Sequence, residues 1–227
     1  KRQLRDRGGP PAQRQPFATA ARLALRQVGA TLKNVRRYRM LAFFLLGFLF
    51  YNEGVQTVLN QANIFAIEVG FRKEELVLLV LMIQFLALPG AVLVGWLSDK
   101  LGQKPTLIGC LAVWVTLLVS AWFVTQKWQF WVLGGVVALV MGGTQSVSRA
   151  IMGVMTPEKH TAEFFGFFNF SGKATSFLGP WIFGLIILVT GSARPAIISL
   201  LAFFLLGWAI VSLVNVREGR RQALADS

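Results

Sequence analysis

The chain contains 227 residues, of which 55% are apolar and only 15% are charged, so it lacks the polar side chains that cover a soluble domain of this size. A single cysteine, Cys110, and a single histidine, His160, exclude a disulfide framework and leave no ligand set for a metal or cofactor. The formal net charge is +13, but nucleic-acid binding is disfavoured because most of the chain is compatible with lipid. Composition therefore indicates an integral membrane protein. The sequence shows no nucleophile–base pair, so an enzyme is disfavoured.

Residues 1–39 form a basic segment that contains 11 of the 23 lysines and arginines and one acid, Asp6. The first part, 1–16, is rich in proline, glycine and arginine and is typical of a disordered linker. Residues 17–39 have apolar side chains at helical spacing, which fits either an amphipathic helix on a membrane surface or a solvated linker. The chain begins at Lys1 with no signal-peptide pattern, so we expect a piece of a longer protein or a processed product.

Six apolar stretches follow, and each is long enough to cross the hydrocarbon core at a rise of about 1.5 Å per residue. They are predicted as helices because they are too long for strands and lack two-residue alternation. The spans are 40–67, 76–97, 105–125, 128–149, 164–189 and 196–216. Short loops require neighbouring helices to run antiparallel, and Gly179 with Pro180 is expected to bend the fifth span. We predict an all-α, six-helix transmembrane domain over 40–216 and a cytoplasmic tail over 217–227.

The distribution of lysine and arginine predicts the orientation of these spans. The side of the basic segment carries 17 of them and the opposite side carries 4, with Arg149 and Lys173 left out because they lie within spans. Both termini are therefore expected to be cytoplasmic, with the segment 1–39 near anionic headgroups.

Three of the spans carry polar side chains along one helical face, although a charge at the centre of a membrane helix costs about 2.5–3.5 kcal/mol. The residues, spaced by three and four, are Glu53, Gln56, Asn60, Asn63, Gln145, Arg149, Asn169 and Lys173. Such stripes indicate the wall of a watery substrate path; the alternative is hydrogen bonding that only joins helices, at about 0.6 kcal/mol per contact. Glu53 is a candidate proton carrier if it is desolvated, or the ion-pair partner of Lys173 or Arg149.

The loop sequence GWLSDKLGQK at 95–104 resembles the helix–turn–helix motif of the major facilitator superfamily. The matching positions are Gly95, Asp99, Lys100, Gly102 and Lys104, and the family's final basic position is Pro105 here. The resemblance implies a cytoplasmic loop between two helices of a six-helix half, in which Asp99 acts as a conformational latch. An ordinary polar turn shaped by Gly102 is the alternative.

Two further stretches, YNEGVQT at 51–57 and the segment 142–180, resemble the second half of the vacuole-effluxer-like branch of that superfamily. The resemblance covers about 40–216 and implies half of a twelve-helix fold, in which 1–39 is the central linker. The missing partner would be an N-terminal six-helix half, or a second copy of this chain. Members include bacterial proteins and a fungal vacuolar transporter linked to amino-acid efflux, so a bacterial plasma (inner) membrane is the expected location.

We therefore expect a secondary active transporter half that moves a small polar solute, with an amino acid favoured, by alternating access. Glu163, Phe164, Phe165 and Gly166, which begin the fifth span, are expected at a cytoplasmic gate or to start the helix. Protons are a candidate coupling ion. Two alternatives remain, an autonomous homodimeric six-helix carrier or channel and a non-transporting membrane scaffold.

Overall fold

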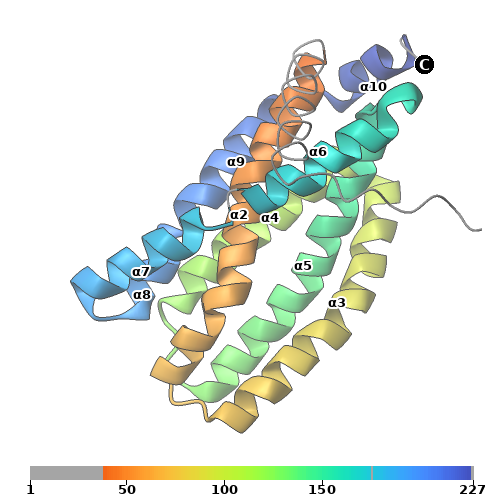
Figure 1. The fold of residues 1–227 in the computed structure, drawn as a ribbon. Coiled ribbons are helices and arrows are strands. Elements are labelled where there is room, and N and C mark those ends of the chain that lie inside the picture. Colours follow the sequence, from red (N-terminus) through yellow and green to blue (C-terminus); the bar gives the residue numbers. More distant parts are fainter. Residues whose placement is uncertain (1–37, 175, 226–227) are drawn as a thin grey trace, which may run out of the picture.

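The computed structural model describes residues 38–174 and 176–225, and within these ranges all regular secondary structure is helical (Figure 1). The expected amphipathic helix at 17–39 falls almost wholly outside the described residues. In chain order the elements are α2 (Arg39–Glu68), α3 (Lys73–Leu101), α4 (Gln103–Ala121), α5 (Lys127–Met155), the 3-10 helix η1 (Glu158–His160), α6 (Thr161–Ala174), α7 (Leu178–Thr190), α8 (Ala193–Ser199), α9 (Leu201–Leu213) and α10 (Val216–Leu224).

Five helical stretches are long and apolar enough to cross a bilayer. They are α2, α3, α4, α5 and the 21-residue stretch Ala193–Leu213, in which α8 leads into α9. These stretches agree with five of the six predicted spans, and the chain is a multi-pass membrane protein.

The predicted fifth span is not one helix. The sequence pattern favoured a continuous helix over 164–189, but α6 ends at Ala174 and α7 begins at Leu178 (Figure 1). Pro180 favours a helix start at this point, because a proline inside a helix lacks the N–H donor and its ring crowds the carbonyl four residues earlier, although Pro89 lies inside α3 without interrupting it. Placed in the first turn of α7, Pro180 needs no intrahelical partner. With 13 residues, α7 is too short to span a bilayer alone, so a six-crossing count is not established.

Helices α3 and α5 pack with their backbones in contact. A Cβ atom at Gly90 of α3 would collide with the backbone of Leu139, and one at Gly142 of α5 would collide with the carbonyl oxygen of Ala87. Small residues permit this close approach, which is the main source of helix association in a membrane, where the solvent is as apolar as leucine. The two helices therefore form a tightly joined pair.

Aromatic side chains fill the interior on the other side of α5. Trp114 of α4 is fully buried and stacks on Phe204 of α9, with ring centroids 5.2 Å apart. Phe48 of α2 stacks on Phe168 of α6 at 4.0 Å. In contrast, α3 presents an apolar outer face in which Phe85 and Leu88 are more than 70% exposed. That face fits lipid or another apolar protein surface.

Candidate functional site

A buried carboxylate lies at the break between α6 and α7. Glu53, on α2, is only 1% exposed, and its Oε1 accepts a hydrogen bond of 2.7 Å from the backbone N–H of Gly179. Gly179 lies in the first turn of α7, where N–H groups lack intrahelical acceptors and the helix dipole favours negative charge. Glu53, on α2, therefore stabilises the start of α7.

The contact between these helices is very close at this point. A Cβ atom at position 179 would collide with Oγ1 of Thr57 and would lie 3.0 Å from Oε1 of Glu53. Thr57 is fully buried on the same face of α2, one turn after Glu53. Only glycine allows α7 to begin against α2 here.

A second polar contact joins α2 to α5. Gln145 donates a hydrogen bond of 3.0 Å from Nε2 to Oδ1 of Asn52, which is buried. Sequence reasoning identified Gln145 but missed Asn52. The sequence signal for Asn52 was its position four residues before Gln56, because this spacing places both amide side chains on one side of the helix.

The same turn of α5 carries further buried hydrogen bonds. Tyr51 Oη and Ser148 Oγ lie 2.7 Å apart, and Trp114 donates from Nε1 to Thr144 Oγ1 at 3.2 Å. Thr144 and Ser148 also donate to backbone carbonyl oxygens four residues earlier on α5. These contacts fix α5 against α2 and α4, which is the role that the interhelical alternative assigns to polar side chains.

The remaining residues of the expected substrate path lie at the surface of the chain. Gln56 is half-buried, whereas Asn60, Asn63, Arg149, Asn169 and Lys173 are exposed. The structure therefore does not enclose the eight residues in one cavity within the described part of the chain. It buries Glu53, leaves Gln56 and Gln145 half-buried and places the other five in an exposed, outward group.

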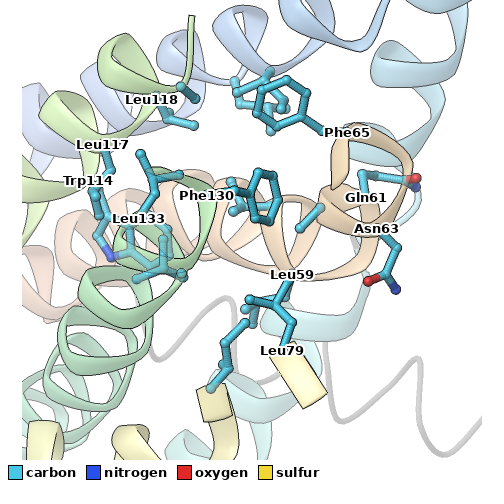
Figure 2. Close-up of a pocket in the computed structure, with 18 of the residues that line it drawn as sticks. Leu59, Gln61, Asn63, Phe65, Leu79, Trp114, Leu117, Leu118, Phe130 and Leu133 are labelled. Carbon is cyan, nitrogen blue, oxygen red and sulfur yellow. The ribbon is translucent and has the colours of Figure 1, made fainter. Parts of the chain in front are cut away.

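Beside Asn63, one cavity of about 70 Å³ lies between α2, α3, α4, α5, α7 and α8. Figure 2 shows aromatic and aliphatic side chains such as Phe130 and Leu133 in its wall, with the amides of Gln61 and Asn63 to one side. A water molecule occupies about 30 Å³ of liquid, and small-molecule pockets measure about 300–1,000 Å³. This cavity is therefore too small and too apolar for a polar solute.

The motif at 95–104 forms a tight turn between α3 and α4. Gly102 has a φ of +92°, the conformation that a side chain disfavours, and it both ends α3 and precedes α4. Lys104 donates from Nζ to the carbonyl oxygen of Ser212 at 2.7 Å, which joins the start of α4 to the end of α9. Lys100 lies 3.8 Å above the ring of Trp96, while Asp99 is exposed and Gly95 has open space around it.

The expected gate residues lie at the start of α6. Phe164 is fully buried and meets Tyr38 edge to face at 5.6 Å, whereas Phe165 is half-buried and Gly166 is exposed. Glu163 lies 3.2 Å from Nδ1 of His160, in the preceding 3-10 helix. This arrangement anchors the beginning of α6 on α2.

Among the residues that the structure describes, no group of three or more histidine, cysteine or acidic side chains is suited to a metal ion.

Comparison with known sequences gives a match over almost the whole chain. The family described as "Vacuole effluxer Atg22 like" matches residues 2–224. The "Uncharacterized MFS-type transporter YxiO" of Bacillus subtilis is 31% identical over 84% of this chain and 45% of its own length. "Autophagy-related protein 22-1" of Aspergillus clavatus is 29% identical over 99% of this chain and 41% of its own length. The chain thus spans less than half the length of these curated relatives.

Proposed function

This chain belongs to the vacuole effluxer Atg22-like family, and from this premise we propose that it forms one half of a major-facilitator-type secondary transporter. The transported molecule is a small polar solute, with an amino acid as the favoured class, and it moves by alternating access. The proposal assigns six membrane crossings to 40–216, with α6 and α7 together making the fifth.

The contact between Glu53 and Gly179 carries this proposal. Many transporters place interrupted helices at their sites, because half-helix ends offer unsatisfied backbone groups and dipole charge inside the membrane. Here α7 begins beside the buried carboxylate of Glu53, which belongs to α2 and accepts a hydrogen bond from the first turn of α7. A purely structural bundle has no need of a full charge at that position, since burying it is costly.

The outward polar side chains support a partner across this face. Asn60 and Asn63 on α2 and Lys173 on α6 are exposed in a chain whose helices cross a bilayer. Polar side chains in membrane segments normally face a bundle interior or a watery cavity. We assign this face to the solute path, completed by an N-terminal six-helix half.

Within that path the charged residues have complementary roles. Arg149 or Lys173 neutralises a carboxylate on the solute, and Glu53 carries a proton or meets an amino group. Gln56 and Asn169 belong to the same path. The amide pair of Asn52 and Gln145 keeps α2 and α5 in register behind it.

The proposed topology has both termini in the cytoplasm of a bacterial cell, with 1–39 as the central linker and 217–227 as the tail. The turn with Asp99, Lys100 and Lys104 then acts as a cytoplasmic latch, and the start of α6 at Glu163 acts as the gate. Replacing Asp99 by asparagine should slow turnover, whereas a normal rate in proteoliposomes would remove the latch role.

A homodimeric carrier is the second candidate, because the exposed polar face would equally suit a second copy of this chain. The mass of the intact native protein in mild detergent separates the two possibilities. A chain of about twice this length that runs as a monomer supports the half-transporter. A native 227-residue product that runs as a dimer supports two-fold symmetry instead.

The transport proposal is tested with the intact protein in proteoliposomes and radiolabelled amino acids. Glu53→Gln and Lys173→Ala should each reduce uptake at least tenfold, while Lys127→Ala should not. Lys127 is the matched control, because it pairs with Glu75 at the opposite end of the bundle, 2.7 Å away. Normal uptake by both path variants would overturn the assignment of the solute path.

A further inference from the structure

A basic groove lies where α3 turns into α4 and α9 leads into α10. It has a volume of about 810 Å³ and is lined by three cationic side chains, Lys104, Arg217 and Arg220, and one anionic side chain, Asp99. Among the residues that the structure describes, none of these four takes part in an ion pair. The groove therefore has an excess of positive charge that a bound anion would offset.

An apolar groove of about 350 Å³ continues from this basic groove along the bundle. It lies between α3, α4 and α5, and its walls include Val94, Gly109 and Val113. Leu101 and Pro105 line both grooves, so the two meet directly. A ligand that filled both would need a charged end and a long apolar part.

Helix α10 places this end of the bundle at the level of lipid headgroups. It lies near the beginning of α2 (Figure 1) and packs Gly219 against the side chain of Met155, while Asn215 caps its start by accepting a hydrogen bond from the N–H of Glu218. Its outer surface exposes arginines together with Leu224, the mixture expected of a helix at a membrane surface. Exposed Trp96 lies at the same end of α3, and tryptophan favours the membrane–water boundary.

We propose that the two grooves form a single binding site for an anionic phospholipid. The phosphate contacts Arg217 and Arg220, and one acyl chain lies in the apolar groove between α3, α4 and α5. Lys104, whose Nζ is bonded to the carbonyl oxygen of Ser212, holds the α4 and α9 sides of the basic groove together. Basic pockets beside membrane helices suit anionic headgroups, and a free phosphate would leave the apolar groove empty. The basic groove shares Asp99 and Lys104 with the proposed latch, but lipid binding is measured directly and does not require the proposed transport activity.

The site is tested by native mass spectrometry of the intact protein in mild detergent, with three probes. Phosphatidylglycerol offers an anionic phosphate and acyl chains, phosphatidylcholine offers the chains with a zwitterionic headgroup, and glycerol 3-phosphate offers the anion alone. We expect phosphatidylglycerol to bind at least tenfold more tightly than either of the others. Equal binding of phosphatidylcholine, or tight binding of glycerol 3-phosphate, would overturn the lipid assignment.

Charge variants locate the headgroup. The double variant Arg217→Gln and Arg220→Gln should weaken phosphatidylglycerol binding about thirtyfold, on the order expected for two basic side chains near a headgroup. Each single variant, Arg217→Gln and Arg220→Gln, is compared with the control Arg221→Gln, which removes one charge from the same helix at a residue outside the groove, near Glu218. Equal losses in the single variants and the control would mean that general surface charge binds the lipid.

A size variant locates the acyl chain. A Cβ atom at Gly109 meets nothing within 4 Å and Gly109 lines the apolar groove, so the side chain of Gly109→Leu takes up space in that groove. Gly184→Leu is the control, because Gly184 also has open space and lies on α7, away from both grooves. We expect Gly109→Leu to weaken phosphatidylglycerol at least tenfold and Gly184→Leu to leave it unchanged. Unchanged binding in Gly109→Leu would show that the acyl chain lies elsewhere.

Discussion

Glu53 and Gly179, separated by 126 positions in the chain, are joined by a hydrogen bond of 2.7 Å from a backbone N–H to a carboxylate oxygen. The bond connects the middle of α2 to the first turn of α7. Three features coincide there: a buried carboxyl group, a helix end and a glycine that permits close contact. Each feature can be tested separately.

Removing the acceptor should destabilise the fold. Glu53→Ala leaves the N–H of Gly179 buried without this acceptor, at an expected cost of about 1–3 kcal/mol in the free energy of unfolding. Glu53→Gln keeps an oxygen at that position and should retain most of the stability, losing the dipole interaction of about 0.3–1 kcal/mol. Thermal unfolding in detergent measures both. Equal losses would mean that the hydrogen bond to Gly179 is not what the carboxylate contributes.

Adding a methyl group at position 179 should disrupt the same contact by sterics. Gly179→Ala directs its Cβ into Oγ1 of Thr57, so we expect a loss of about 1–3 kcal/mol, as for other overpacked sites. Thr57→Ala removes the opposing hydroxyl, and the double variant should recover part of the loss. A double-mutant cycle on unfolding free energies should give a coupling of about 0.5–3 kcal/mol. Additive effects would contradict the direct clash.

The contact between α3 and α5 predicts unequal effects for two glycines. Gly142→Ala places a methyl group against the carbonyl oxygen of Ala87, which is backbone and has little freedom to move, so the unfolding temperature should fall. Gly184→Ala adds the same methyl group to α7 in open space, and should be neutral or stabilising by up to about 1 kcal/mol. Similar unfolding temperatures for the two variants would contradict the backbone contact.

Arg194 should not be replaceable by lysine. Its guanidinium donates to the carbonyl oxygens of Trp122 and Val124, at 2.6 and 2.7 Å, and lies 3.8 Å from a carboxylate oxygen of Glu68. A lysine ammonium lacks the planar fork that reaches separate acceptors at once. We expect Arg194→Lys to lower stability by about 1–2 kcal/mol, close to the loss from Arg194→Gln. Full stability in the lysine variant would show that charge alone matters at this position.

The span positions could be predicted because apolar length is a local property of the sequence. The position of the break before α7 could not be predicted, because the polar stretch 171–176 and the pair Gly179 and Pro180 suit a bent continuous helix as well as an interrupted one. Spacing also placed Glu53 and Asn60 on one face of α2, yet Glu53 is buried and Asn60 is exposed. The face follows from helical geometry, whereas burial depends on α7 starting beside Glu53, which local periodicity does not encode.

The close packing of α3 and α5 determines where distance changes can be measured during turnover. Because Gly90 and Gly142 already meet the opposing backbone, sliding or separation of the two helices would break a direct contact between their backbones. Pairs of spin labels on α3 and α5 should therefore report a single, narrow distance distribution in every state. Labels on α6 and α7 bracket the interruption between these two helices, and their distance distribution should broaden or shift when solute is added.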